Sequence, residues 1–219
     1  EDPSIHSGHP QQAFPAMTEH AAGTFAVERA SIWLFDEAQS ALVLQDLYEA
    51  TPRRHSQGTT LSTREYPSYL RALETEPYSL AAHAARTDPR TRELAPSYLV
   101  PLGIVSMLDA PIRRHGRVVG VLCLEHVGAL KTWTSEEEAF AASLAAMATL
   151  TLEAADRRQA QEALERHVRD RTGELRRMTA HLQTIIEESP LAMIELDQAG
   201  RVTTWNAAAT ALFGWTREE

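Results

Sequence analysis

Residues 134–189 contain no proline and only one glycine, Gly173. Because these two residue types most often interrupt helices, their scarcity over such a distance predicts one long helix. At about 1.5 Å per residue, that helix would be on the order of 80 Å long, which is more than one small domain can cover. We therefore expect a folded unit at each end of the helix.

Apolar side chains recur along this stretch at alternating spacings of three and four residues. They form one seam whose members are Phe140, Met147, Leu150, Ala154, Leu164, Val168, Leu175, Met178, Leu182 and Ile185. The remaining seam positions are Ser143, Arg157, Gln161 and Arg171. An apolar stripe that continues over several heptads between charged flanks predicts a coiled coil rather than a helix folded onto its own domain.

The composition argues against several classes of protein. With 43% hydrophobic and 23% charged residues over 219 positions, the chain is ordinary for a soluble globular protein of one or two domains. Its net charge of −9, with only 21 lysines and arginines, argues against a general nucleic-acid binder. The one arginine-rich run, residues 166–177, is interleaved with carboxylates and is typical of a solvated helix face.

A single cysteine, Cys123, rules out an internal disulfide and is typical of a reducing compartment. The sequence shows no signal peptide and no run of about 18 apolar residues, so we expect a cytoplasmic location and no membrane span in this chain. The chain begins without methionine and ends in the middle of a pattern, which is typical of a piece of a longer protein.

The first third of the chain alternates between polar and apolar segments. Residues 1–15 are polar and rich in proline, which predicts a disordered or extended lead. Residues 16–27 have helical apolar spacing. Residues 31–36 and 41–49 are rich in aromatic and β-branched side chains and predict a hairpin of two strands. Residues 51–62 predict a polar loop.

The next segments continue this alternation. Residues 62–76 predict a short helix capped by Ser62 or Thr63, and residues 78–84 predict a short strand. Residues 87–98 predict a helix with a proline near its first position. The segments 104–113 and 117–126 are apolar on both faces, which predicts two central strands covered by helices on each side.

The turn between these two strands predicts their register. If His115 and Gly116 form a two-residue turn, Val105 lies opposite His126, and Asp109 lies opposite Leu122. One face then carries Val105, Met107, Asp109, Leu122, Leu124 and His126. The other face carries Ser106, Leu108, Ala110, Val121, Cys123 and Glu125.

The first of these faces combines polar and apolar groups, which suits a ligand cavity with a few convergent hydrogen-bonding residues. An alternative is that Asp109 caps a neighbouring loop or helix and that His126 is a core histidine with satisfied hydrogen bonds. The residues leave both interpretations open.

The order of helices and strands predicts an α+β domain built on one antiparallel sheet, over residues 16–155. Beyond the long helix, residues 191–197 and 201–205 predict a strand pair, and Asn206 predicts the cap of a helix over residues 207–213. These last residues are too few to fold alone, so we interpret them as the start of a second domain.

Several segments resemble known families. The sequences ERASIWLFD (28–36), SMLDAPI (106–112), GRVVGVLCLEH (116–126) and WTSEEE (133–138) resemble the GAF domains of bacterial sensor proteins. The sequences ESPLAMI (188–194) and WNAA (205–208) resemble the opening of a PAS domain. The sequence ALERHVRDRTGEL (163–175) is similar to helical linkers of histidine kinases and diguanylate cyclases.

These resemblances imply a domain order and a fold. We expect a lead at residues 1–15, a GAF domain at 16–155, a coiled-coil linker at 156–187, and an incomplete PAS domain at 188–219. The GAF domain is expected to have a six-stranded antiparallel sheet with helices on both faces and a ligand cavity on one face. Parallel homodimerisation is expected through the linker seam of Leu164, Val168, Arg171, Leu175, Met178, Leu182 and Ile185.

The resemblance also implies candidate ligand-binding residues. His83, Arg86, Arg92 and Tyr98 lie in the segment that covers the cavity in GAF relatives, and the arginines could bind an anion. Together with Met107, Asp109 and His126, they form the expected site. The alternative is that residues 86–92 are an exposed loop and helix start. GAF domains bind cyclic nucleotides, bilins, haem, small metabolites or nothing, so the ligand stays open.

The sequence lacks the patterns of common cofactor sites and active sites. Cys123 is flanked by leucines in a strand, so we expect a small core residue rather than a thioether to a bilin. The histidines form no HxH or HxxxH pair, and no phosphate loop, GxSxG or HExxH motif occurs. We expect no metal site, no haem or bilin signature, and no catalysis by this chain.

These features together predict a sensory input module of a multidomain bacterial protein. A molecule in the GAF cavity would change the conformation of the domain, and the dimeric helix would relay the change to PAS and output domains. Arg157, Gln161, Arg171 and Gly173 would weaken part of the coiled coil, as a relay with two states requires. The alternative is a ligand-free GAF domain that serves dimerisation or protein interaction.

Overall fold

The computed structural model describes residues 9–216, so most of the expected lead, residues 1–8, lies outside the described part of the chain. The chain divides into two compact units, residues 1–158 and 159–219. The first contains a sheet with helices on both faces. The second contains a short strand pair and a helix, and the long helix contributes residues to both units.

The sheet of the first unit is antiparallel throughout and follows the order β3-β2-β1-β7-β6-β5, with β4 also paired to β2. Its strands are β1 (Arg29–Phe35), β2 (Ala41–Glu49), β3 (Arg54–Ser56), β4 (Thr60–Ser62), β5 (Leu80–Ala82), β6 (Ile104–Arg114) and β7 (Arg117–Val127). The sheet thus has seven strands rather than six. β3 and β4 replace the expected loop, because strands of three residues show no readable alternation.

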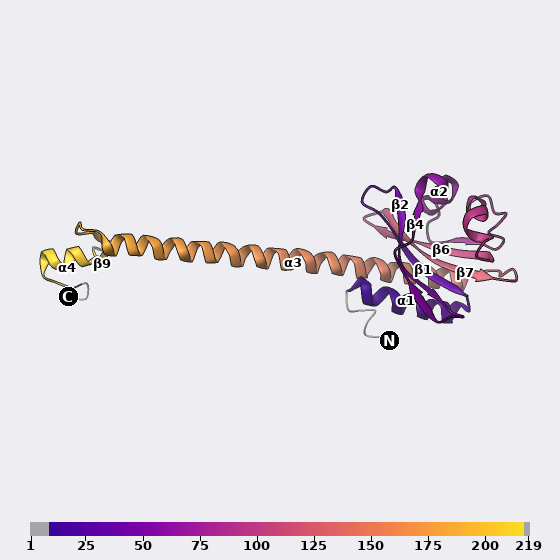
Figure 1. Cartoon of the computed structure of the whole chain (residues 1–219), viewed down its shortest axis with the longest axis horizontal. Helices are drawn as coiled ribbons and strands as arrows, with labels where there is room; N and C mark the ends of the chain where they lie inside the picture. Colours follow the sequence, from indigo (N-terminus) through magenta and orange to yellow (C-terminus); the bar gives the residue numbers. More distant parts are fainter. Residues whose placement is uncertain (1–8, 217–219) are drawn as a thin grey trace. The chain divides into compact units, whose positions relative to one another are not determined.

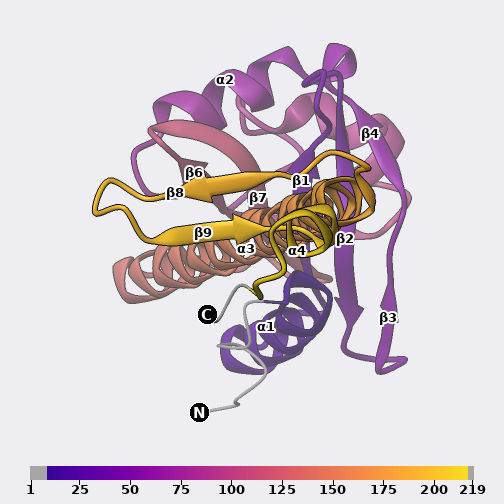
Figure 2. The same cartoon turned by 90° about the vertical axis from the view of Figure 1, so that its left-hand side faces the viewer.

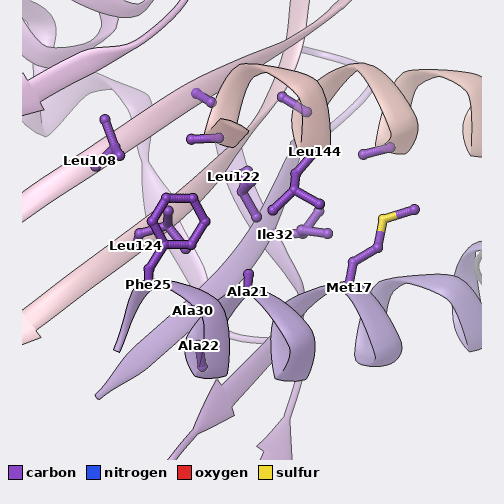
Figure 3. Close-up of a cluster of buried hydrophobic side chains, with 14 of the residues drawn as sticks. Met17, Ala21, Ala22, Phe25, Ala30, Ile32, Leu108, Leu122, Leu124 and Leu144 are labelled. Carbon is purple, nitrogen blue, oxygen red and sulfur yellow. The ribbon is translucent and has the colours of Figure 1, made fainter. Parts of the chain in front are cut away.

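Helices cover both faces of this sheet (Figure 1). On one face, α1 (Pro10–Phe25) and the first turns of α3 (Ser135–Glu188) form a hydrophobic core with β1, β6 and β7. Figure 3 shows Phe25, Leu144, Ile32 and Leu124 meeting in this core. On the other face lie α2 (Pro67–Thr75) and the short helices η1 (Thr63–Glu65), η2 (Arg92–Leu94) and η3 (Ala95–Leu99).

The first helix begins earlier than its sequence pattern predicts. It starts at Pro10 and ends at Phe25, so the boundary expected between residues 15 and 16 is wrong. Proline is tolerated in the first turn, where its missing N–H would have no intrahelical partner. The extension buries Ala13 and Phe14 against the sheet, and this burial stabilises a helix that also contains Pro15.

Two further helix predictions need correction. The helix expected over residues 62–76 is divided, because Pro67 disfavours helical backbone at Tyr66, and α2 begins only at Pro67. The helix expected over residues 87–98 is reduced to η2 and η3. There, the Asp88 carboxylate accepts hydrogen bonds from the backbone N–H of Arg90, at 2.9 Å, and from the guanidinium group of Arg90. These bonds stabilise a turn instead of capping a helix.

The central hairpin of β6 and β7 has the predicted turn but a different register. His115 and Gly116 both have positive φ, at 49° and 78°, as a two-residue type I′ turn requires. Arg113 pairs with Val118, but Ile112 pairs with Gly120, so Val119 is an extra residue that forms a bulge. Asp109 therefore lies opposite Cys123 and not opposite Leu122.

This bulge exchanges the two faces of β7. Met107 and Asp109 share their face with Cys123 and Glu125, on the α2 side of the sheet. Leu122 and Leu124 belong to the core under α1 and α3. The predicted grouping of Asp109 with Leu122, Leu124 and His126 is therefore wrong.

Gly120 lies directly after the bulge, where β7 packs closely against β1. A Cβ atom at this position would lie 2.2 Å from the backbone oxygen of Trp33 and 2.6 Å from Cδ2 of Leu34. Real side chains do not tolerate such distances, so only glycine fits without a shift of the backbone.

We expect Gly120→Ala to destabilise the chain by roughly 1–3 kcal/mol, because the added methyl group must displace the backbone of β1. Urea unfolding monitored by circular dichroism would measure the change. Gly23→Ala in α1 is the matched control, because nothing lies within 4 Å of a Cβ there. That control should stabilise the chain by about 0.5–1 kcal/mol through helix propensity. Equal effects of the two substitutions would contradict the close packing at Gly120.

The long helix α3 agrees with the expected stretch. Thr134 and Glu137 form a capping box, in which Thr134 N–H donates to Glu137 Oε2 at 2.9 Å and Glu137 N–H donates to Thr134 Oγ1 at 3.2 Å. The helix then continues for 54 residues without interruption. Its first turns bury Ala141, Leu144 and Ala145.

The second unit contains the predicted strand pair and helix. β8 (Ile194–Leu196) pairs antiparallel with β9 (Val202–Trp205), and α4 (Ala207–Phe213) follows (Figure 2). Asn206 caps α4 as predicted, because its Oδ1 accepts a hydrogen bond from Ala209 N–H at 3.0 Å. Large apolar side chains of this unit, including Leu191, Leu196 and Phe213, are exposed.

Candidate functional site

A small cavity of about 20 Å³ lies on the α2 side of the sheet. It is lined by Trp33, Leu42, Leu61, Tyr69, Leu94, Tyr98, Met107, Val121, Cys123 and Glu125. A cavity of this size holds about one water molecule. Sites for drug-sized ligands usually enclose about 300–1,000 Å³, so a larger ligand would enter only if the covering helices moved.

Three polar side chains meet beneath α2. The Tyr69 hydroxyl donates a hydrogen bond of 2.8 Å to Oδ2 of Asp109, and it lies 3.8 Å from Sγ of Cys123. Asp109 is completely buried, and its Oδ1 has no hydrogen-bond partner among the described residues. Burial raises the pKa of this carboxyl to about 7, with the Tyr69 hydrogen bond acting in the opposite direction.

Burial also makes the neighbouring thiol inert. It raises the pKa of Cys123 well above its usual value, and the carboxyls of Asp109 and Glu125 raise it further. Since the thiolate is the reactive form of cysteine, this thiol is a poor nucleophile in the folded protein. Cys123 is free and buried, as expected of a small core residue, but it lines the cavity.

A second polar group borders the cavity at Glu125. Arg29 Nε donates to Glu125 Oε2 at 2.9 Å, and its Nη1 donates to Glu49 Oε1 at 2.7 Å. Burial raises the pKa of Glu125, while Arg29 and the Tyr98 hydroxyl lower it in part. The buried carboxylate is thus compensated by a guanidinium, as buried charges require.

The first unit matches a family defined by its sequence. The family model described as "GAF domain" matches residues 9–152, about two thirds of the chain. The chain belongs to the GAF domain family. A second family model, described as "PAS fold", matches residues 180–219.

One curated relative extends over nearly the whole chain. It is an uncharacterized protein of Azorhizobium caulinodans, 29% identical over 215 residues. The match covers 93% of this chain but only 26% of that protein. The chain therefore spans about a quarter of the length of the curated relative that it matches.

Solved structures share the fold of the GAF domain. The GAF domain of an Acinetobacter phosphoenolpyruvate-protein phosphotransferase is 21% identical, with a TM-score of 0.57, over 69% of this chain and 87% of that one. The blue-light absorbing form of the Thermosynechococcus elongatus PixJ GAF domain is 16% identical, with a TM-score of 0.58. The match covers 72% of this chain and 93% of that one. A domain of a putative two-component sensor histidine kinase from Sinorhizobium meliloti is 19% identical, with a TM-score of 0.53. The match covers 69% of this chain and 96% of that one.

The GAF domain brings together three of the seven residues expected at the site. Tyr98 and Met107 line the cavity, and Asp109 contacts it through Tyr69. The other four lie elsewhere. His83 Nδ1 accepts from Trp133 N–H at 3.1 Å, and Arg86 Nε donates to Ile104 O at 2.6 Å.

The remaining two expected residues also lie outside the cavity. Arg92 is exposed on η2. The bulge places His126 on the opposite face of the sheet from Asp109, with Nδ1 at 3.0 Å from Glu28 Oε2. Whether any of the seven residues binds a ligand stays a prediction.

Tyr69, Cys123 and Glu125 line the cavity, although the sequence pattern does not predict them there. Tyr69 was recognisable only as an apolar position of a helix, and its hydroxyl partner is 40 residues away. The sequence predicts Cys123 and Glu125 on the other face, because the bulge in this hairpin has no reliable sequence signal. Their strand was correctly predicted, and only its register was wrong.

The end of the β6–β7 hairpin connects the cover of the cavity to α3. Arg113 Nη2 donates to the backbone oxygens of Leu73 and Glu76, at 3.0 and 2.8 Å, where α2 ends. Thr149 Oγ1 of α3 donates to Arg113 O at 3.1 Å, and Arg114 forms an ion pair with Asp156. The end of the hairpin is therefore in contact with both α2 and α3.

Other functional features are absent from the described part of the chain. No group of three or more His, Cys, Asp or Glu side chains in residues 9–216 is placed to hold a metal ion. Within those residues, no helix has the length and apolar character needed to cross a membrane.

The raised pKa of Asp109 predicts a specific pH dependence of stability. Between about pH 4 and pH 7, the folded state holds a proton on Asp109 that the unfolded state has lost, so stability falls as the pH rises. Asp109→Asn removes the carboxyl group and with it this pH dependence of stability. We expect the variant to gain stability relative to the wild type by roughly 1 kcal/mol per pH unit over this range, measured by urea unfolding.

Asp36→Asn is the control for this measurement. Hydrogen bonds from Ser40 lower the pKa of the Asp36 carboxyl, so its contribution to stability is already complete above about pH 5. The difference between Asp36→Asn and wild type should stay constant from pH 5 to 8. A constant difference for Asp109→Asn as well would show that Asp109 does not hold this proton.

Proposed function

We propose that this chain is a sensory input module of a larger bacterial signal-transduction protein. In this proposal, the GAF domain responds to a small molecule or partner, and α3 relays the response as part of a dimer. Both matched families are sensory domains, which supports the coarse assignment. The observation that carries the finer proposal is the exposed apolar seam of α3.

The seam consists of large apolar residues that a single chain leaves in water. Leu175 and Met178 are each 63% exposed, and Leu164 is 62% exposed. Val168, Leu182 and Ile185 continue the same stripe at spacings of three and four. Exposed apolar stripes of this length are typical of helices that pack against another helix.

A second copy of the chain is the partner that this seam fits. In a parallel pair, each seam residue faces its own counterpart, so the apolar positions of the two copies match without any shift. Arg171 would face a second Arg171, and Gly173 follows it, so this segment would be the least stable part of the pair. A marginal segment allows two arrangements that differ by a few kcal/mol.

The proposed relay begins at the GAF cavity. A ligand larger than water would displace α2 or η3, and the contacts of Arg113 with α2 and Thr149 would carry the displacement to α3. The PAS domain and an output domain would receive it. We propose a cytoplasmic location and a non-catalytic role for this chain, with a histidine kinase or diguanylate cyclase type of output in the whole protein.

The small volume of the cavity favours a second candidate function. The free space of about 20 Å³ between the lining side chains has room for about one water molecule. A ligand-free GAF domain would then act as a dimerisation module, with the same seam and without a chemical signal.

Cysteine crosslinking tests the dimer. Under mild oxidation, Met178→Cys chains should form disulfide-linked dimers rapidly, because position 178 faces its counterpart across the seam. Arg177→Cys, one residue away on the exposed flank, is the matched control and should crosslink at least tenfold more slowly. The native Cys123 is buried and should not contribute. Equal crosslinking at both positions, or a monomer in sedimentation, would refute the parallel seam.

Analysis of bound molecules separates the two candidate functions. If the cavity takes a ligand, mass spectrometry of the denatured protein should release a small molecule, and adding it back should raise the melting temperature. It should also change the crosslinking rate of Met178→Cys. If no molecule is released and none of a metabolite panel shifts the melting temperature, the dimerisation module is the correct function.

A further inference from the structure

An open cleft of about 730 Å³ lies on the surface between α2 and the β6–β7 hairpin. It shares no lining residue with the cavity beneath α2. Its walls include Leu70 on α2, Phe35 at the end of β1, and Val118 on β7. The volume is within the usual range of small-molecule sites, which the internal cavity is not.

Three arginines that line this cleft have no side-chain partner among residues 9–216. Arg64 of η1, Arg71 of α2 and Arg117 of β7 line it and are exposed. No hydrogen bond or ion pair engages their guanidinium groups within the described residues. A fourth lining arginine, Arg113, is engaged by the backbone oxygens at the end of α2.

The cleft therefore has an excess of positive charge in an acidic protein. Glu74 is the one carboxylate among the described lining residues, against four arginines. Glu37 and Glu65 are close in sequence to the lining but do not belong to it. Since the chain as a whole has a net charge of −9, this concentration of unpaired guanidinium groups gives the cleft a field of opposite sign.

We propose that this cleft binds a small molecule that carries phosphate groups and an apolar portion. Guanidinium groups bind phosphate oxygens through paired, charge-assisted hydrogen bonds, and Arg64, Arg71 and Arg117 approach from three different elements. Phe35, Leu70 and Val118 provide apolar surface for the remainder of the molecule. The inference does not depend on a ligand in the internal cavity.

A bound anion would join the two elements that form the cleft. Arg64 and Arg71 belong to the segment of η1 and α2, and Arg117 belongs to the hairpin. Arg113 already connects these elements at the other end of α2. Occupation of the cleft would thus hold α2 against the hairpin and stabilise the domain.

Calorimetric titration with pyrophosphate and with a nucleoside triphosphate, in 150 mM salt, tests the site. The whole chain should bind at least one of the two probes, and the melting temperature should rise with probe concentration. Combined substitution Arg64→Gln, Arg71→Gln and Arg117→Gln should weaken binding at least tenfold. Because the three side chains are exposed and unpaired, the variant should fold normally.

Matched controls distinguish the cleft from general charge attraction. Arg71→Gln alone should weaken binding several-fold, whereas Arg53→Gln, which removes an exposed arginine outside the cleft, should leave it unchanged. Equal binding by the triple variant and the wild type would overturn the proposal. Absence of heat and of any thermal shift with both probes, together with no vesicle binding, would also overturn it.

Vesicles separate the two sources of phosphate. Vesicles that contain 30% phosphatidylserine present the same oxyanion at a lipid surface, and neutral vesicles are the comparison. If only the anionic vesicles bind the chain, and the triple variant is released, then the cleft recognises a lipid headgroup. If only the soluble probes bind, the ligand is a free phosphorylated molecule. Both outcomes require the same three arginines.

Discussion

The bulge at Val119 in the central hairpin decides which side chains of β7 face α2. It shifts the pairing by one residue, so Cys123 and Glu125 join Asp109 beneath the covering helices. Leu122 and Leu124 then complete the core under α1 and α3. Gly120 makes this arrangement possible, since no side chain fits between β7 and the backbone of Trp33. The positions of the cavity and both cores depend on this one irregularity.

The cavity beneath α2 is small, but the polar groups buried beside it lower the stability of the folded state. Asp109 is buried with one oxygen unpartnered, and a pKa of about 7 corresponds to roughly 4 kcal/mol against its ionised form. Buried polar groups with incomplete hydrogen bonding are uncommon in folded proteins and are concentrated at functional sites. A ligand or a single water that donated to Oδ1 would offset part of this cost. A hydrogen bond to Asp109 at this small site would therefore contribute favourably to the binding of a ligand.

The surface of the domain provides a different kind of site. Its cleft is large and basic, while the cavity beneath α2 is small and lined mainly by apolar side chains, with Glu125 as its carboxyl group. The two sites flank α2, and the hairpin end contacts both α2 and α3. Ligands at either site would act on the same helix, either displacing it from the sheet or holding it in place. In the proposed relay, both sites would act on α3 through the contacts of the hairpin end.

The sequence by itself determined the α+β architecture, the long helix, the central hairpin and the start of the second unit. These follow from local patterns: apolar periodicity, turn residues with positive φ, and capping residues such as Thr134 and Asn206. The shortest elements could not be predicted, because β3, β4, η2 and η3 have only three to five residues each and show no period. Only the tertiary structure decided the register of β7 and the partners of Asp109. The physical reason is that a bulge is stabilised by packing between strands distant in sequence, here Gly120 against Trp33, and such a contact leaves no periodic signal in either strand.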